Sequence, residues 1–260
     1  MRDKKLRPPR IVKIAGKADI ASLQRSIFEN ENLRGADLSG RRLDQFASVG
    51  SHFERCDFSG STLKSCSFGS GTKTSKYIDC VFDSSRIEFS SGGIARFVRC
   101  SFKNVELRNW FCFTVELVDC TFSGGLNKVI FNGRVPEDDR RVAGRSVNQI
   151  EGNDFSGADF VDVGFRTGVD LSKQRLPDGP KYLYVPNAER AIGFTRSRVL
   201  AWEDSEDKKS AISMLRALDF ESSGGQRQLL LYRDDYLLPN GQSQPADAVI
   251  HLLAQAGNGA

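Results

Sequence analysis

Cysteine is the residue type in this chain whose spacing first suggests chemistry. Four of the six cysteines lie in similar pentamers, ERCDF, IDCVF, VRCSF and VDCTF, and Cys80, Cys100 and Cys120 are 20 residues apart. Thiolates bind soft metals and form disulfides, so a regular series of cysteines could hold a metal or a cross-link. The secondary structure around these cysteines therefore determines whether they can carry out such chemistry or only pack in the core.

Other candidates for catalysis or metal binding are sparse. His52 and His251 are the two histidines, and neither has a Cys or Ser nucleophile at a spacing that suggests catalysis. The motifs GxxxxGK(S/T), HExxH, CxxC and GxSxG do not occur. Asp138 and Asp139 could contribute to a cation site, but we favour a solvated acidic loop. We therefore predict that the protein is not an enzyme and has no catalytic, cofactor or metal site.

A large apolar residue recurs every five positions through the first two thirds of the chain. One run passes through Leu33, Leu38, Leu43, Ser48, Phe53, Phe58, Leu63 and Phe68, and a second run extends from Tyr77 to Phe122. The residue two positions earlier is usually small. A period of five fits neither a helix nor a strand, whereas fixed self-similarity is typical of a solenoid, in which repeats bury their apolar faces against their neighbours.

The segments LRGADLSGRRL, FERCDFSGSTL and NDFSGADF resemble the pentapeptide repeat, A(D/N)LXX, and the resemblance covers about residues 31–171. Similarity to the pentapeptide-repeat family implies a mainly β fold, a right-handed quadrilateral parallel β-helix. Both the large residue and the small residue two before it then point inward. At 20 residues per turn, we expect about six coils.

One face of this β-helix carries a ladder of related side chains. The inward large residues are Phe58, Phe82, Phe102 and Phe122, and the inward small residues are Cys56, Cys80, Cys100 and Cys120. Parallel Cβ atoms on successive coils are ~4.8 Å apart, beyond the roughly 3.5–4.5 Å of a disulfide, so we predict reduced packing thiols. The outward neighbours of these cysteines alternate in charge: Arg55, Asp79, Arg99 and Asp119. We interpret this alternation as a structural ladder that fixes register.

Three parts of the chain follow from the repeat. Residues 1–30 form a basic segment that could cap the solenoid, residues 31–175 form the β-helix, and residues 176–260 form a mostly α-helical domain. We predict helices at 187–202, 205–219 and 246–254, while 228–232 could be strand or helix. Two insertions, at 69–75 and 132–148, fall at the same corner of the coil, so two loops should leave one edge of the rod.

Charge is balanced along the solenoid. The net charge is +4, but residues 31–175 contain 20 basic and 19 acidic residues. Phosphate-driven binding needs a concentrated basic surface, so we predict no direct contact with nucleic acid. The chain has no long apolar stretch and no signal-peptide pattern, which favours a cytoplasmic protein without a membrane span.

The segment NWFCFT places two aromatic side chains on the outside. Trp110 and Cys112 occupy inward positions, which leaves Phe111 and Phe113 outward, and Ile130 follows on the next coil. Such a patch needs a cover. Either the C-terminal helices fold back over it, or it forms a protein-binding site together with the loops, the longer of which carries Glu137, Asp138, Asp139, Arg140 and Arg141.

The predicted function is therefore a non-enzymatic protein–protein interaction scaffold whose unidentified partner binds at the loop-bearing edge. The family resemblance implies an alternative, because some quinolone-resistance proteins of this family protect DNA gyrase, a type II topoisomerase. Those members are acidic rods that mimic DNA, and the balanced charge counts against this alternative. A third possibility is an unrecognised activity in residues 176–260. The same residues could also form a homodimer.

Overall fold

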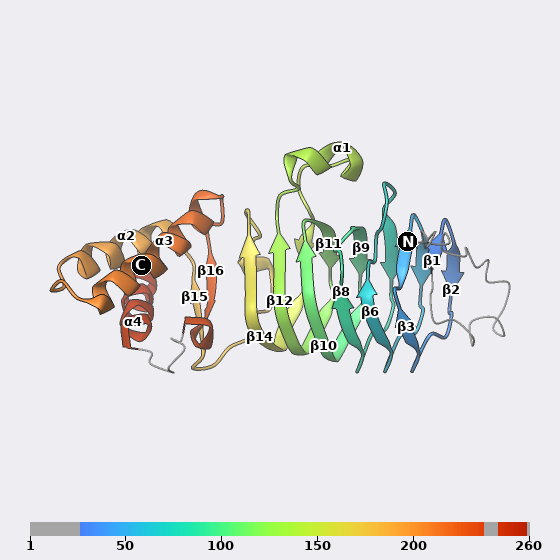
Figure 1. The fold of residues 1–260 in the computed structure, drawn as a ribbon, viewed down its shortest axis with the longest axis horizontal. Coiled ribbons are helices and arrows are strands. Elements are labelled where there is room, and N and C mark those ends of the chain that lie inside the picture. The colour runs from blue at the N-terminus through green and yellow to red at the C-terminus, as the bar shows by residue number, and fades with distance from the viewer. Residues whose placement is uncertain (1–26, 237–243, 259–260) are drawn as a thin grey trace, which may run out of the picture.

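Figure 1 shows a parallel β-solenoid followed by a helical domain. The computed structural model describes residues 27–236 and 244–258. One six-stranded sheet contains β3 (Arg42–Asp44), β6 (Thr62–Cys66), β8 (Arg86–Phe89), β10 (Ser101–Cys112), β12 (Thr121–Asn132) and β14 (Asp154–Arg166). A second contains β2 (Asn32–Arg34), β5 (His52–Glu54), β7 (Ser75–Ile78), β9 (Ile94–Val98), β11 (Thr114–Val118) and β13 (Ile150–Glu151). Six rungs separated by about five turns confirm the predicted mainly β solenoid.

Strand register confirms the alignment of the repeats. In the first sheet the in-register residues are Leu43, Leu63, Ile87, Leu107, Leu126 and Phe160. In the second sheet they are Leu33, Phe53, Tyr77, Phe97, Leu117 and Ile150. Both insertions are therefore accommodated outside the coils, without displacing the inward residues.

The first described strand lies N-terminal to the predicted start of the solenoid. β1 (Ile27–Glu29) pairs in parallel with β4 (Ala47–Val49), and Phe28 is completely buried. Within the described residues, the solenoid therefore includes Ile27–Glu29, four residues before residue 31. The remainder of the predicted N-terminal cap, residues 1–26, lies outside the described residues.

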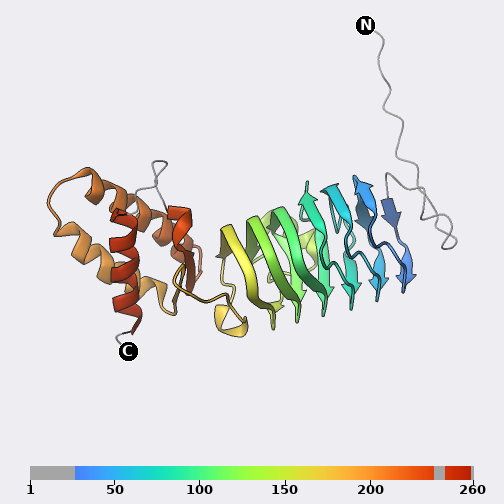
Figure 2. The ribbon, with the colours of Figure 1, turned by 90° about the horizontal axis from the view of Figure 1, so that it is seen from below.

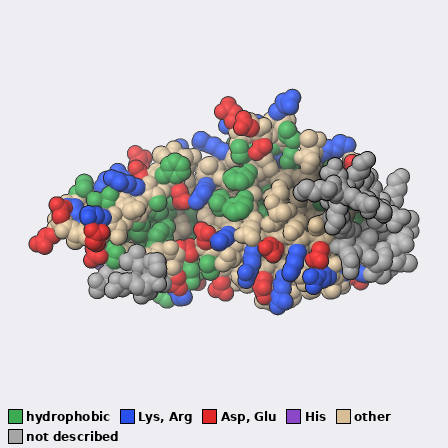
Figure 3. All heavy atoms as spheres, viewed as in Figure 1, with side chains coloured by type: hydrophobic (Ala, Val, Ile, Leu, Met, Phe, Trp, Pro, Cys, Tyr) green, Lys and Arg blue, Asp and Glu red, His purple; other side chains and the backbone are tan. Residues whose placement is uncertain are grey.

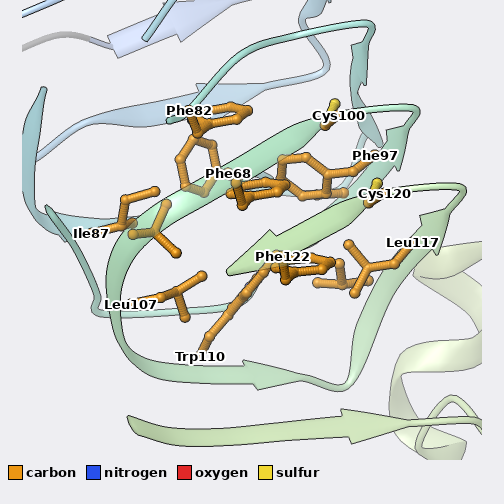
Figure 4. Close-up of a cluster of buried hydrophobic side chains, with 14 of the residues drawn as sticks. Phe68, Phe82, Ile87, Phe97, Cys100, Leu107, Trp110, Leu117, Cys120 and Phe122 are labelled. Carbon is orange, nitrogen blue, oxygen red and sulfur yellow. The ribbon is translucent and has the colours of Figure 1, made fainter. Parts of the chain in front are cut away.

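Stacked aromatic rings fill the interior of the solenoid (Figure 4). Ring centroids are 4.6–4.8 Å apart along a column formed by Phe58, Phe82, Phe102, Phe122 and Phe155. A second column places Tyr77 between Phe53 and Phe97. The Tyr77 hydroxyl lies 2.7 Å from Oγ of Ser48, so the one polar residue in the first five-residue run provides a partner for this buried phenol.

All six cysteines are buried and free, as expected for packing thiols. The thiols of Cys56, Cys80 and Cys100 donate to carbonyl oxygens of the preceding coil over 3.4–3.5 Å. Burial raises the pKa of the Cys66 and Cys112 thiols. The protonated thiol is a poor nucleophile, so neither position favours thiolate chemistry.

The charged ladder lies at one corner, where its four residues have positive φ angles between 51° and 54°. Arg99 donates two hydrogen bonds to the Asp79 carboxylate, at 2.7 and 3.0 Å, and thereby lowers the pKa of Asp79. Arg55 instead pairs with its neighbour Glu54 at 3.1 Å. The predicted pairing between coils is therefore direct only between Asp79 and Arg99 among the four.

The C-terminal domain is mostly helical. It contains β15 (Tyr182–Val185), α2 (Ala188–Leu200), α3 (Glu206–Ser223), β16 (Leu229–Tyr232) and α4 (Gln244–Asn258). Asn187 and Ser205 cap α2 and α3 by accepting hydrogen bonds from backbone amides three residues later. Helices α3 and α4 are longer than the predicted helices at 205–219 and 246–254. Residues 229–232 are a strand, and the antiparallel β15–β16 pair that includes them was not predicted.

This domain covers the last coil of the solenoid (Figures 1 and 2). The side chain of Gln226 is completely buried: its oxygen accepts from the amides of Gly168 and Val169, and its nitrogen donates to the Val169 carbonyl. Arg166 pairs with Glu221 of α3 at 3.2 Å. Polar contacts therefore satisfy backbone groups that would otherwise be exposed at the end of the rod.

Candidate protein-binding site

Phe111 and Phe113 project from the end of β10. Their inward neighbours Trp110 and Cys112 are completely buried, and alternation along the extended chain therefore directs both phenylalanines outward. Trp110 stacks on Phe89 with centroids 4.7 Å apart, which anchors the inward side of this segment. The outward direction of the pair is thus fixed by the core.

The two outward rings form a small apolar surface. Their centroids are 6.4 Å apart at an interplanar angle of 19°, and the side chains are 39% and 46% exposed. Ile130 of β12 is the in-register neighbour of Phe111 and is half-buried. We refer to Phe111, Phe113 and Ile130 as the aromatic patch. Figure 3 shows hydrophobic side chains gathered on this face of the solenoid, below the projecting α1 segment.

The C-terminal helices do not cover the aromatic patch. They pack beyond β14 at the end of the rod, while the exposure of both phenylalanines shows that their rings remain accessible. The possibility that these helices fold back over the patch is therefore wrong. The helical domain packs against β14 at the end of the solenoid and does not extend along its side, which leaves the patch uncovered.

The longer insertion forms a hairpin-like loop with a helical tip. Its stem is an antiparallel bridge between Arg134 and Val147. The tip consists of η2 (Glu137–Asp139) and α1 (Arg140–Ala143), which ends at Gly144 in the left-handed conformation with φ 68°. The predicted loop thus has secondary structure of its own and projects from the edge of the rod (Figure 1).

Two residues that we did not single out from the sequence attach this loop beside the aromatic patch. Asn148 is buried, and its side-chain nitrogen donates to the carbonyl oxygens of Phe113 and Asn132 at 2.8 and 2.9 Å. Arg145 donates to the Thr114 carbonyl at 2.8 Å, and its guanidinium lies 3.6 Å from Glu116. The contacts with Phe113 and Thr114 join residues that are more than 30 positions apart in the sequence. Only the alignment of the coils could therefore have indicated their partners.

Burial also affects the electrostatics of this attachment. It lowers the pKa of Arg145, whereas the nearby Glu116 carboxylate opposes that effect. Glu116 binds Arg96 as well, at 3.0 Å, so one carboxylate serves two guanidinium groups. The base of the loop is therefore a connected polar network, which favours a fixed position relative to the patch.

The charged residues at the tip are solvent-exposed. All five predicted site residues, Glu137, Asp138, Asp139, Arg140 and Arg141, are exposed. Arg140 contacts Glu137 at 3.8 Å and donates to the Val135 carbonyl. Within the described ranges, no hydrogen bond or ion pair joins these five residues to the aromatic patch. The charged loop tip and the aromatic patch lie on the same edge of the rod. They are two separate surfaces, one polar and one apolar.

The shorter insertion lies nearer the N-terminal coils. Residues 69–74 form the loop, since Ser75 is already buried within β7. Lys73 donates to the Asn30 side chain at 2.9 Å, and the amide of Ile94 donates to the Gly69 carbonyl. No hydrogen bond or ion pair between the two loops occurs in the described part of the chain. The predicted site that combines both loops therefore remains a hypothesis.

Two general properties hold for the described residues. Each of their helices is too short or too polar for a membrane span. No three of their His, Cys, Asp or Glu side chains are close enough to share a metal ion.

Comparison with known proteins gives structural similarity only. No protein-family model and no curated protein matches the chain. Three solved structures of QnrB1, described as a plasmid-mediated fluoroquinolone resistance protein, are similar at 16% identity. Two trypsin-treated variants give TM-scores of 0.27 and 0.23 and the full-length protein 0.20, each covering 58% of this chain and 80%, 78% and 82% of QnrB1, respectively. Because these TM-scores are low, the fold assignment rests on the strand order and register. The described coils have the five-residue, four-faced arrangement of a pentapeptide-repeat solenoid.

Proposed function

We propose that this chain is a non-enzymatic protein–protein interaction scaffold and that its partner binds the aromatic patch and the neighbouring loop. The observation that carries the proposal is the exposed Phe111–Phe113 pair, fixed from below by Trp110 and Cys112. Aromatic side chains commonly contribute most of the binding energy at protein interfaces. The attached loop supplies polar groups that could form the rim of such an interface.

Replacement of the patch tests this proposal. The double substitution Phe111→Ser and Phe113→Ser should abolish capture of the partner by the full-length protein, with little change in folding. The matched control is Val161→Ser, because Val161 is 45% exposed but lies on β14, outside the aromatic patch and the loop. A partner captured equally well by wild type and by the double variant does not use this site.

A second pair of variants separates the patch from the tip. Substitution of Arg140 and Arg141 by Ala removes exposed charge without touching Arg145 or Asn148, which attach the loop. We expect this change to weaken binding less than loss of the two phenylalanines, because exposed charges contribute mainly to association rate and specificity. The opposite ranking would place the interface at the tip.

The projecting 132–148 loop also favours the topoisomerase alternative that the family resemblance implies. The charge pattern opposes it: in-register outward pairs of the first sheet join opposite charges, Asp44 with Lys64 and Glu88 with Arg108. A duplex mimic would instead present a continuous acidic surface. A gyrase supercoiling assay with and without a quinolone separates the alternatives. No effect at excess protein excludes this function for that enzyme.

The C-terminal domain is proposed to mediate homodimerisation. Phe220 and Leu200 are 80% and 56% exposed, respectively, and therefore offer apolar surface on α3 and at the end of α2. Light scattering on Phe220→Asp should report a lower mass than wild type if α3 forms the interface. Equal masses exclude Phe220 from it. The further possibility of an activity in residues 176–260 has no candidate catalytic residue among those described.

A further inference from the structure

A cleft lies where the solenoid, the stem of the 132–148 loop and the helical domain meet. Its volume is about 500 Å³, and its lining includes Arg134, Thr167 and Asp170 from the solenoid side and Pro186 and Arg227 from the helical domain. Small-molecule sites typically have volumes of ~300–1,000 Å³ and often lie between domains. Size and position thus suit a small ligand, away from the aromatic patch.

Arg134 and Arg227 give this cleft its chemical character. They come from different domains, both line the cleft and both are exposed. Neither guanidinium makes a hydrogen bond or an ion pair with another described residue. Two cations with unused donors therefore line one small cleft. Guanidinium groups hold oxyanions through several parallel hydrogen bonds.

Gly225 positions the Arg134 guanidinium at the domain junction. Gly225 has φ 96°, and a Cβ at this residue would lie 3.3–3.5 Å from atoms of that guanidinium. The absence of a side chain therefore leaves the arginine close to the backbone of the helical domain. The position of the Arg134 side chain therefore depends on the solenoid, which carries it, and on Gly225 of the helical domain.

Asp170 and Thr167, two other polar residues of the cleft, are already engaged. Asp170 accepts from the Ser172 amide at 3.0 Å and from its hydroxyl at 2.6 Å, and these bonds lower the pKa of Asp170. Thr167 accepts from the Arg134 amide at 3.0 Å. Two arginines against one aspartate leave an excess of one positive charge in the cleft. An anionic ligand would restore the balance.

We propose that this cleft binds a phosphate-bearing small molecule whose phosphate group is held between Arg134 and Arg227. A phosphate offers several acceptor oxygens around one centre, and can accept from two guanidinium groups that approach from different sides. A single carboxylate presents two oxygens in one plane and fits one guanidinium better. This ligand site is separate from the proposed protein interface and does not depend on it.

Calorimetric titration of the full-length protein with inorganic phosphate and with pyrophosphate tests the proposal. Wild type should bind at least one of the two anions, and Arg134→Gln and Arg227→Gln should each weaken binding roughly tenfold, as expected for loss of a charged hydrogen-bonding partner. Arg216→Gln, at an exposed position of α3 outside the cleft, is the matched control and should bind as wild type does. Near-UV circular dichroism on each variant monitors folding.

Several results would overturn the proposal. These are absence of binding of both anions by wild type, unchanged binding in the double arginine variant, and equal weakening in Arg216→Gln. Malonate provides the carboxylate arm of the experiment. If malonate binds more tightly than pyrophosphate, the assignment to phosphate is wrong. If Arg134→Gln loses near-UV signal, Arg134→Lys provides the second variant and must retain measurable phosphate binding.

Discussion

Phe102 and Phe111 lie on the same strand but have opposite predicted roles. Phe102 is completely buried, with Phe82 and Phe122 stacked on either side at 4.6 and 4.8 Å. Phe111 is 39% exposed. Substitution of each by alanine therefore compares the same chemical change on the inward and the outward face of one strand, β10.

The expected free-energy costs differ clearly. Removal of a buried phenylalanine from a packed core costs about 3–5 kcal/mol, and the two stacked contacts favour the upper part of that range for Phe102→Ala. Full burial of a phenylalanine contributes roughly 1.5–3 kcal/mol, so partial exposure limits Phe111→Ala to about 1 kcal/mol. We expect a difference of at least ~2 kcal/mol between the two variants.

Urea unfolding monitored by tryptophan fluorescence measures this difference. The chain has two tryptophans, Trp110 in the solenoid core and Trp202 in the helical domain, so a Trp202→Phe background makes the signal specific for the solenoid. Free energies are compared only if the denaturant slope is unchanged. Equal destabilisation would identify Phe111 as a core residue. A cost below ~1 kcal/mol for Phe102→Ala would refute a continuous packed stack.

Three further predictions concern the loop, the domain junction and the thiols. Asn148→Ala should release the loop locally and speed hydrogen exchange in residues 134–147; unchanged exchange would show that this amide does not hold the loop. Burial raises the pKa of Glu221 above its usual 4.5, although the Arg166 guanidinium opposes that effect. The Glu221 contribution to stability should therefore be fully present below about pH 4.5 and decrease as the pH rises through the folded-state pKa. Thermal unfolding of wild type and Glu221→Gln between pH 4 and 7 measures this decrease, and a growing advantage of wild type with pH would contradict it. Finally, the buried thiols, including Cys66 and Cys112, should react with a thiol reagent only after unfolding, so rapid reaction of the native protein would contradict their packing.

The solenoid could be predicted because its information is local and repeated. An inward residue at every fifth position specifies four faces, and each coil supplies an independent check on the next. The position of Leu126 illustrates this point: it pairs with Leu107, although the separation is 19 residues, because the register shifts after Phe102. The five-residue period requires that missing residue before Leu126 from the sequence alone.

The missed features depend on contacts that do not repeat. Asn148 reaches the carbonyl of Phe113 across 35 residues, and Gln226 reaches Val169 across 57. Neither residue type nor local pattern identifies such partners. The antiparallel pair β15–β16 was missed for the same reason, since each strand is four residues long and gains its partner from a distant segment. The aromatic patch was located by periodicity, but only the packing of the helical domain decided that it stays exposed.

The residues beside the patch argue that its aromatic character is not required by the solenoid. Phe111 and Ile130 occupy an outward column that continues with Gly164 on β14. The glycine at this position supports the same parallel pairing, so the pairing of strands does not demand a large side chain. An outward phenylalanine at this place gains little from the fold and exposes apolar surface to water. We therefore infer that the requirement lies outside the rod, and the Phe111 and Phe113 substitutions should affect binding far more than stability.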